Sequence, residues 1–396
     1  MNKLNGLIQE LCPDGVEYKK VKEAFQRLRG TPITAGKMKE IEDPTGEIKI
    51  FAGGKTIINA KEENIPNANI TRVPAVLVQS RGVIDVVYYD KPFTFKNEMW
   101  AYTADNEIKV KYLYYVLKNN IQGFRDAASG MGSLPQISLP VTEDFRIPLP
   151  PLPVQREIVR ILDNFTELTA ELTAELTARQ KQYEHYRDEL LTFGDDVPKM
   201  EVGKLFSVRN GYTPSKSNAA FWENGTIPWI RLEDIRISGR ILHGGIQKVT
   251  PLAVKRNGIF PAGSVIISTT ATIGEHALLM VDALTNQQIT CLTIRSEYTE
   301  KLLPKFVFYY AFVLGEWCKK NVNQGGGLPI IGTEKIKTFL FPVPDVEIQR
   351  HIISVLDRFD TLCNDLTSGL PAEIAARQKQ YEYYRDKLLT FGEKEN

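Results

Sequence analysis

The feature of this sequence that most limits its fold is a long segment that occurs twice. Residues 148–194 contain PLPPLPVQREIVRILDNFTEL and RQKQYEHYRDELLTFG, and residues 342–392 contain PVPDVEIQRHIISVLDRFDTL and RQKQYEYYRDKLLTFG. Matching positions are 194 residues apart in the first block and 198 apart in the second, so the later copy has four additional residues between the blocks. The chain is therefore expected to consist of two related halves.

Each copy has the residue spacing of a long helix that packs on another helix. Mostly apolar and aromatic residues alternate at intervals of four and three from Ile158 to Phe193, and again from Ile352 to Phe391. A helix over about 154–193 would be ~60 Å long. The four extra residues of the second copy act as a stutter that keeps its seam on one face. Gly369 and Pro371 are expected to kink or break the second helix, which leaves its continuity open.

A globular segment precedes each long helix. Short runs rich in β-branched and aromatic residues, separated by Gly, Pro, Asn and Asp, predict mixed and largely antiparallel sheets. One helix (111–128 or 305–322) and one glycine-rich loop (129–137 or 323–331) then follow in each half. The expected strands are 48–54, 55–60, 73–80, 83–90 and 92–104 in the first half, and 225–235, 263–274, 276–282 and 286–295 in the second.

The fold class that this pattern predicts is α+β with an internal pseudo-two-fold repeat. Two α/β domains with mixed sheets are separated by a pair of long antiparallel coiled-coil helices. The expected borders are 1–151 for the first domain, 152–194 for the central helix, 195–344 for the second domain and 345–396 for the C-terminal helix.

Composition excludes several classes of protein. The chain has 396 residues, of which 43% are hydrophobic, but no apolar run reaches the ~20 residues of a membrane span. The start, MNKLNGLIQELCPDG, lacks the apolar core of a signal peptide, so we expect a cytoplasmic protein without a membrane partner. The four cysteines are far apart, which favours reduced structural thiols over disulfides or zinc ligands.

Charge is divided unevenly along the chain. Residues 1–151 carry 20 Lys and Arg against 18 Asp and Glu, and residues 195–344 carry 17 against 12. The helical segments 152–194 and 345–396 carry 5 against 8 and 7 against 10. This division fits globular parts that contact phosphate and helices that contact protein.

Motifs for catalysis are missing or incomplete. The GGKT that contains Lys55 and Thr56 has Lys49 where a phosphate-binding loop needs its first glycine. The four histidines are scattered, and Glu275 beside His276 is a weak candidate pair. We expect no catalytic residue, no metal site and no cofactor bound by this chain.

The function that these residue types still support is the recognition of a ligand through hydrogen bonds. Gly-rich loops and the strand ends QSRG (79–82) and STTAT (268–272) place hydrogen-bonding side chains where a ligand can approach. Arg and Lys can bind guanine, Asn and Gln can bind adenine, and Thr can contact the thymine methyl group. The candidate DNA-binding residues are Lys55, Gln79, Ser80, Arg81 and Ser133 in the first half, and Arg209, Lys216, Arg231, Thr269, Thr270 and Gln324 in the second.

In this organisation the chain resembles the specificity subunits of type I restriction-modification systems. The resemblance covers nearly the whole chain and is carried by the helix entries IPLPPLPVQREI and FPVPDVEIQRHI, the repeated RQKQYExYRDxLLTF and the four-residue repeat TAELTAELTA (169–178). GYTPSKSNAAFW and GTIPWIRLEDI within 211–235, and FAGGKTIINA (51–60), resemble parts of two types of target-recognition domain in this family.

This resemblance implies that each target-recognition domain binds one half of a bipartite, asymmetric site in double-stranded DNA, with the helices setting the spacing. It also implies two methyltransferase subunits that use S-adenosylmethionine for adenine N6 methylation, and restriction subunits, with ATP and magnesium, that can join them. The helix seams have two interpretations, purely intramolecular packing or packing combined with partner docking on the outer faces. We favour both roles, and the expected docking residues near the helix ends are Gln180, Tyr183, Tyr186, Gln378, Tyr381 and Tyr384.

Two other function classes would require different features from those of DNA recognition. A single-chain modification enzyme or nuclease would need a methyl-donor glycine loop or a carboxylate–lysine site, and the sequence offers neither. A coiled-coil adaptor whose globular parts bind protein or glycan would show no salt-dependent binding to DNA, whereas phosphate contacts weaken steeply with salt.

Overall fold

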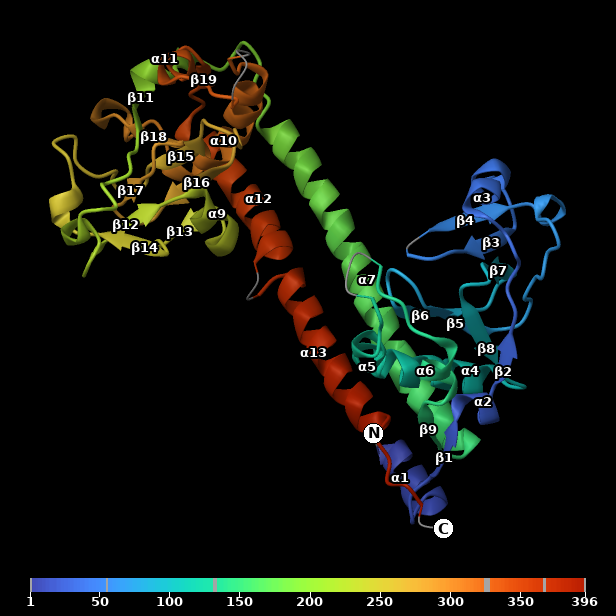
Figure 1. Ribbon diagram of the computed structural model, residues 1–396. Helices are drawn as coiled ribbons and strands as arrows, with labels where there is room; N and C mark the ends of the chain where they lie inside the picture. Colours follow the sequence, from blue (N-terminus) through green and yellow to red (C-terminus); the bar gives the residue numbers. More distant parts are fainter. Residues whose placement is uncertain (1, 55, 131–133, 324–327, 366–367, 395–396) are drawn as a thin grey trace. The chain divides into compact units, whose positions relative to one another are not determined.

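The computed structural model describes residues 2–54, 56–130, 134–323, 328–365 and 368–394 (Figure 1). The chain divides into two compact units. Unit 1 comprises Met1–Thr173 and Glu373–Asn396, and unit 2 comprises Ala174–Ala372. Each unit therefore combines sequence from both copies of the repeat.

Unit 1 begins with a helix and continues with short strands. Its elements up to the first long helix are α1 (Asn2–Leu11), β1 (Glu17–Lys20), α2 (Val21–Ala24), β2 (Gln26–Leu28), α3 (Ala35–Ile41), β3 (Ile48–Phe51), β4 (Ile57–Ala60), η1 (Glu62–Asn64), β5 (Ala75–Gln79), β6 (Asp85–Tyr89), β7 (Phe93–Phe95), β8 (Trp100–Thr103), α4 (Glu107–Asn119), α5 (Ile121–Asp126), α6 (Leu139–Glu143) and β9 (Arg146–Leu149).

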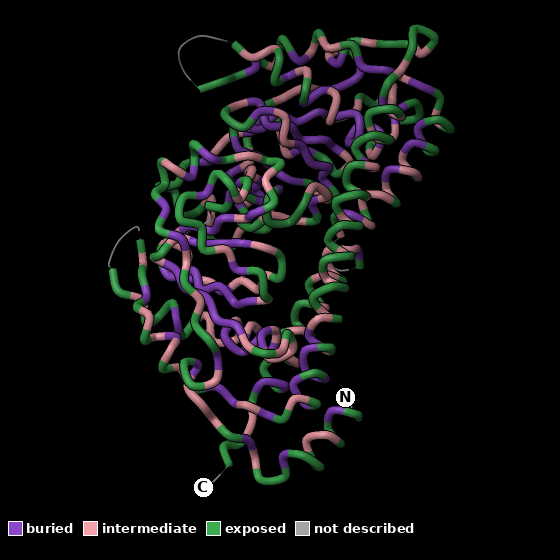
Figure 2. The backbone as a smooth tube through the Cα atoms, turned by 90° about the vertical axis from the view of Figure 1, so that its right-hand side faces the viewer, coloured by how far each residue is buried: buried purple, intermediate pink, exposed green. Residues whose placement is uncertain are grey.

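The sheets of unit 1 are mixed and largely antiparallel, as expected. One sheet has the order β2-β8-β5-β6 and is antiparallel throughout, and the other has the order β4-β3-β7 with β3 and β7 parallel. Strand β5 is buried along its whole length, since α4 covers one face of its sheet and Phe51, Phe93 and Phe95 lie in the cluster on the other. Buried residues are purple in Figure 2.

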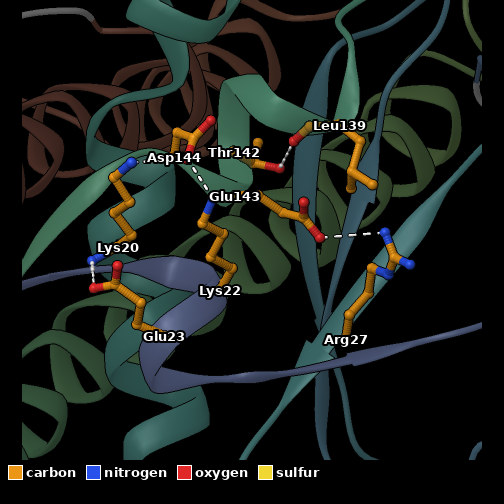
Figure 3. A network of polar contacts seen from close by, with 8 residues as sticks. All are labelled: Lys20, Lys22, Glu23, Arg27, Leu139, Thr142, Glu143 and Asp144. Atoms are coloured by element: carbon orange, nitrogen blue, oxygen red, sulfur yellow. Dashed lines mark hydrogen bonds and ion pairs between the residues drawn. The ribbon is translucent and has the colours of Figure 1, made fainter.

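A polar network joins α6 and the residue after it, Asp144, to the segment from β1 to β2 in unit 1 (Figure 3). Asp144 accepts from the ammonium groups of Lys20 at 3.1 Å and Lys22 at 2.8 Å, and Arg27 pairs with Glu143 at 3.2 Å. These pairs are exposed and each adds little to stability. The buried hydroxyl of Thr142 on the same helix takes part in hydrogen bonds with Trp100 and Tyr102, which anchors α6 to β8.

Unit 2 repeats this order with longer connections. Its elements are β10 (Lys199–Glu201), α8 (Val202–Leu205), β11 (Phe206–Asn210), η2 (Ala219–Phe221), β12 (Ile227–Ile230), α9 (Leu232–Ser238), β13 (Ile241–Leu242), β14 (Gln247–Val249), η3 (Pro251–Ala253), β15 (Val265–Ser268), β16 (His276–Leu279), β17 (Leu284–Thr285), β18 (Ile289–Ile294), η4 (Ser296–Tyr298), α10 (Pro304–Lys320), α11 (Thr333–Lys337), β19 (Leu340–Pro342) and α12 (Val346–Asn364).

The sheets of unit 2 are also mixed. The order β11-β18-β15-β16-β13 is antiparallel except for the pair β13–β16, and β14-β12-β17 contains the parallel pair β12–β17. Helix α10 packs on β15 and β16, just as α4 packs on β5 and β6 in unit 1. The predicted helix 305–322 is thus one helix, whereas the predicted helix 111–128 is divided at Asn120 into α4 and α5.

The first long helix is continuous. Helix α7 (Leu152–Leu190) has 39 residues, and its first part belongs to unit 1 and its last part to unit 2. Between 165 and 183 the positions of the predicted seam are less exposed than most of their neighbours. In unit 1 Phe165 stacks on Tyr384 at 5.5 Å, and in unit 2 Phe359 contacts Tyr183 at 6.2 Å and Tyr186 at 5.5 Å.

The second long segment is interrupted near the predicted position. Helix α12 ends at Asn364, and α13 (Leu370–Leu388) starts immediately after Gly369, with Pro371 in its first turn. The amide of Gly369 donates to the carbonyl of Asp365 at 3.0 Å. A Cβ at this glycine would lie 2.5 Å from the carbonyl oxygen of Thr361, so only glycine fits this close approach.

The same backbone joints attach the globular part to the helix in both units. Strand β1 pairs with β9, and β10 pairs with β19, both antiparallel. The side-chain amide of Gln155 donates to the carbonyl of Pro150 at 2.8 Å, and that of Gln349 donates to Pro344 at 2.8 Å. The repeat in the sequence is therefore also a repeat of hydrogen bonds.

Candidate nucleic-acid interface

The end of β5 forms the centre of the candidate site in unit 1. Gln79 is its last residue, and the side-chain amide of Gln79 donates to the carbonyl of Gly54 at 3.3 Å. Ser80 is fully buried, and its hydroxyl donates to the carbonyl of Glu98. Arg81 comes next and is exposed, so it is the side chain that this strand end presents to solvent.

The glycine-rich segment lies against this strand end. The amide of Ile137 donates to the carbonyl of Ser80 at 2.9 Å, and the amide of Gly82 donates to the carbonyl of Pro135 at 2.9 Å. Gly82 has a φ of 78°, a backbone conformation that favours glycine. These bonds connect backbone atoms, so they hold the loop in place whatever its side chains are.

A third segment contacts the strand end and the loop that together form the edge of the candidate site. The amide of Gly54 donates to the carbonyl of Arg81 at 3.0 Å, which brings the GGKT turn beside the strand end. A cavity of about 590 Å³ opens here, lined by Gly53, Gly54, Arg81, Gly82 and Leu134 together with residues of α3 and β4. Three segments that the sequence analysis named separately therefore meet at one place.

Unit 2 builds the equivalent edge. The amide of Ile331 donates to the carbonyl of Thr269 at 3.0 Å, and the amide of Ala271 donates to the carbonyl of Pro329 at 3.0 Å. Ala271 has a φ of 64°, so the chain adopts this turn even without a glycine. The predicted pair Thr269 and Thr270 thus occupies the position that Ser80 and Arg81 occupy in unit 1.

Several predicted DNA-binding residues have partners inside the protein. Thr269 is 2% exposed, and its hydroxyl lies 3.0 Å from that of Thr290. The guanidinium of Arg209 donates to the carbonyls of Asn257 and Ile259 and covers the ring of Phe260 at 4.6 Å. These side chains shape the site from within.

The remaining predicted residues differ in exposure. Arg231 pairs with Glu233 at 2.8 Å and lies over Trp229 at 5.6 Å. Lys216 is exposed and Thr270 is partly exposed. Lys55, Ser133 and Gln324 lie outside the described residues.

The tyrosines expected to dock partners lie mainly in the seam between helices. Tyr183 is 6% exposed, while Tyr381 and Tyr384 are half-buried within unit 1. Tyr186 is 38% exposed although it contacts Phe359. Gln180 and Gln378 face solvent, and so offer free amides on the outer surface.

Two exposed leucines at the candidate site were not among the predicted residues. Leu134 is 57% exposed and Leu328 is 71% exposed, and each precedes the proline that the loop hydrogen bond holds. They are 194 positions apart, the same offset as the repeat. That identity in otherwise different loops was the signal that could have identified them.

The ionisable groups that burial perturbs most lie away from these edges or within the core. Burial, together with the charge of Arg240, lowers the pKa of His276 to about 3. Burial raises the pKa of the thiols of Cys291 and Cys318 to about 12, so they stay protonated. All four cysteines are buried as free thiols. Among the described residues, no group of His, Cys, Asp and Glu side chains is arranged to hold a metal ion.

None of the described helices combines the length and the hydrophobicity that crossing a bilayer requires.

Comparisons with known proteins agree on one family. The family model described as "Type I restriction modification DNA specificity domain" matches the chain twice, over residues 13–179 and 194–376. The chain is 36% identical over 377 residues to the specificity subunit of the type I restriction enzyme EcoR124I/EcoR124II of Escherichia coli, covering 91% of this chain and 90% of that protein.

A second relative matches more strongly over a shorter stretch. The specificity subunit of the type I restriction enzyme EcoprrI of Escherichia coli is 46% identical over 214 residues, which covers 52% of this chain and 53% of that protein. The match therefore spans about half the length of that relative.

Solved structures share the fold. The S subunit of a type I restriction-modification system from M. genitalium aligns with a TM-score of 0.61 at 14% identity, covering 95% of this chain and 96% of that one. A chain from a structure on the assembly and conformational transition of a type I restriction-modification system aligns with a TM-score of 0.56 at 15% identity, covering 95% and 98%.

Proposed function

Because the chain belongs to the family of type I restriction-modification specificity subunits, we propose that each half of it reads one half of a bipartite, asymmetric DNA site. Its role is recognition, and the chemistry belongs to other subunits. The recognition domains comprise 1–151 and 195–344, the helical segment 152–194 connects them, and 345–396 is the C-terminal spacer helix.

The observation that carries this proposal is the repeated edge built by a strand end and a glycine-rich loop. In both units the loop is fixed by backbone hydrogen bonds on either side of an exposed or partly exposed residue, Arg81 in one and Thr270 in the other. The frame is the same and the side chains differ. This is the arrangement that two different half-sites require.

The side chains that contact DNA are the exposed ones at these edges. We assign Arg81 and the loop leucine Leu134 in the first domain, and Thr270 and Leu328 in the second, and we keep Lys216 as a further candidate because it is exposed. Lys55, Ser133 and Gln324 stay candidates by their place in the sequence. Gln79, Ser80 and Thr269 hold the edge in shape, since their side chains are buried.

Arg209 and Arg231 belong to the second domain and have intramolecular partners. Each keeps unused donor groups, because a guanidinium has five N–H bonds. They support the recognition surface and can add contacts to phosphate when DNA is bound.

The helices have two roles in this proposal. Their facing sides, with Phe165, Tyr183, Phe359 and Tyr384, hold α7 against α12 and α13 and so separate the two half-sites by a fixed length. Their outer sides, with Gln180 and Gln378 exposed, dock two methyltransferase subunits. Tyr186 and Tyr381 are at the border between these faces.

The reaction assigned to the complex is adenine N6 methylation. We place S-adenosylmethionine in the methyltransferase subunits, and ATP and magnesium in the restriction subunits that can join them. Such a complex acts in the cytoplasm, where DNA and S-adenosylmethionine are both available.

The test is to express the full chain with its methyltransferase and to map methylated adenines by sequencing single DNA molecules. The expected result is one motif in two parts, separated by a spacer of constant length. Exchange of residues 1–151 for the first domain of another family member should replace one half of the motif and leave the other unchanged. A single continuous motif, or methylation that ignores the exchange, would show that the proposal is wrong.

A further inference from the structure

A carboxylate on the long helix holds the recognition domain in unit 1. Asp163 of α7 accepts two hydrogen bonds from α4, one from the hydroxyl of Tyr115 at 2.6 Å and one from the ammonium of Lys111 at 3.1 Å. The two donors bind different oxygens of the same carboxylate. Burial and this hydrogen bond raise the pKa of Tyr115, so its hydroxyl keeps the proton that it donates.

Unit 2 contains the same three residues in the same arrangement. Asp357 of α12 accepts from the hydroxyl of Tyr309 at 2.6 Å and from the ammonium of Lys305 at 2.5 Å. All three positions are 194 residues after their counterparts. The loops and strands around them have diverged, so this contact has persisted where much else has changed.

The geometry of this contact restricts both the sliding of the domain helix along its axis and its rotation about that axis. Lys and Tyr are four residues apart, on successive turns of one helix, and both reach the same carboxylate. Sliding the domain helix by one residue would move it ~1.5 Å and rotate it by about 100°, which would break both bonds. Charge-assisted hydrogen bonds are also shorter and stronger than neutral ones.

In unit 1 this contact is connected through α4 to the strand end 79–82 and the loop bonded to it, which together we call the reading edge. At the other end of α4, Lys118 pairs with Asp85 at 2.6 Å. Asp85 lies opposite Gln79 in the β5–β6 ladder, and Gln79 is the residue at which the edge begins. A short chain of polar contacts thus runs from α7 through α4 to the reading edge.

In unit 2 an aromatic contact replaces the ion pair that connects the domain helix to the sheet. Phe312 stands where Lys118 stands in unit 1, and its ring meets that of His276 edge to face at 4.5 Å. His276 is the first residue of β16, which pairs with β15, the strand that leads to Thr269. The route from helix to edge is therefore the same, although the chemistry of this step is apolar.

We propose that Asp163 and Asp357 are positioning residues that determine how strictly the spacer length is enforced. Each one sets the angle and the axial position of a reading edge on its long helix. This inference rests on the proposed function, because it requires two half-sites at a fixed separation. In this inference the preference for one spacer length depends on the contacts between helix and domain as well as on the length of the helices.

The test uses the full chain in complex with its methyltransferase, and a set of DNAs that share both half-sites while the spacer varies by up to two base pairs either way. The variants are Asp163→Ala, Tyr115→Phe and Tyr309→Phe. The matched control is Lys109→Met in α4, which removes an exposed ion pair with Asp105 and leaves Asp163 untouched.

The expected result is that preference for the correct spacer over spacers one base pair longer or shorter falls about tenfold in the variants, as expected for loss of a charge-assisted hydrogen bond. The half-site sequences and the control should not change. Tyr115→Phe removes one hydroxyl and keeps the ring, so it tests the contact even if Asp163→Ala fails to fold.

The inference is overturned if folded variants keep the spacer preference of the unmodified chain. It is also overturned if they lose recognition of one half-site at every spacer, because the contact would then serve the domain and not its position. A failure of the proposed function looks different, since the unmodified complex would then show no two-part motif at all.

Discussion

Gly15 and Gly392 lie so close together that a Cβ on Gly15 would stand 2.5 Å from the carbonyl oxygen of Gly392. The amide of Val16 donates to that same carbonyl at 2.9 Å, and the amide of Lys394 donates to the carbonyl of Val16 at 3.0 Å. The corresponding segments of the other copy, around Gly194 and Val197, are joined covalently. In unit 1 backbone hydrogen bonds thus join two segments whose counterparts at 194–197 are continuous in the chain.

This contact predicts that Gly15→Ala destabilises unit 1. Gly15 has a φ of 94°, so alanine would be strained there, and the close carbonyl adds a clash. The expected loss is about 2 kcal/mol in the free energy of unfolding, measured by urea denaturation. Gly6→Ala in α1 is the control, since its Cβ meets nothing within 4 Å and alanine favours a helix. Equal effects of the two substitutions would contradict the role given to this junction.

Acid should weaken unit 2 through His276. Its pKa in the folded protein is about 3 against an ordinary value of 6.5, so the unfolded chain binds the proton more readily between these values. Stability from this group is complete above pH 6.5 and declines as the pH falls, by about 2 kcal/mol at pH 5. Thermal unfolding of the chain and of His276→Phe, followed from pH 7.5 to 5, would show this. A variant with the same pH dependence as the unmodified chain would argue against it.

Arg81→Ala should reduce affinity for DNA of any sequence and also relax the choice of bases in one half-site. Loss of one cationic contact is expected to lower the salt slope of the binding constant by about one. Fluorescence anisotropy of the methyltransferase complex at several KCl concentrations measures this slope. Lys181→Ala, on an exposed position of α7, should leave it unchanged. An unaltered slope for Arg81→Ala would remove this residue from the interface.

The loop leucines are expected to contribute to binding and not to folding. Leu134→Ser and Leu328→Ser should each weaken binding several-fold, and only through the half-site of their own domain, because an exposed leucine can contact a thymine methyl group. Thermal stability should stay within about 0.5 kcal/mol. Leu252→Ser is the control, since this leucine is 73% exposed but lies in η3. A fall in stability without a fall in affinity would assign the leucines to the fold.

Deletion of one TAEL unit, Thr173–Leu176, should shorten the spacer and preserve both half-sites. Four helical residues correspond to ~6 Å along the helix axis, or between one and two base pairs of DNA. Methylation mapping of the deleted chain with its methyltransferase gives the new spacer directly. If the selected sites kept their original spacing, α7 would not set the distance between half-sites.

Much of the fold could be predicted because the signals were periodic or repeated. The seam from Ile158 to Phe193 required a long helix, and α7 spans nearly all of it. Gly369 and Pro371 predicted the interruption that separates α12 from α13. The strand ends and glycine-rich loops were named separately, and the structure brings them together through backbone bonds that follow no side-chain pattern.

The roles of single side chains were harder to predict, because their partners are distant in the sequence. Arg209 was predicted to contact DNA, and the sequence did not indicate that its guanidinium also donates to carbonyls about fifty positions away. Ser80 and Thr269 are polar residues at strand ends, a pattern that does not distinguish an exposed contact from a buried one. For Asp163 a signal was present, since its Lys and Tyr partners keep the 194-residue offset, but hydrogen bonding between them appears only in three dimensions.

The loops at the two reading edges are held by main-chain amides and carbonyls, as between Gly82 and Pro135 or between Ala271 and Pro329. Such bonds are indifferent to which amino acid stands beside them. Mutation can therefore change the outward side chains one at a time without a penalty in foldability. Proteins with this architecture can therefore evolve new target sequences through substitutions of these outward side chains, while the backbone that supports them stays the same.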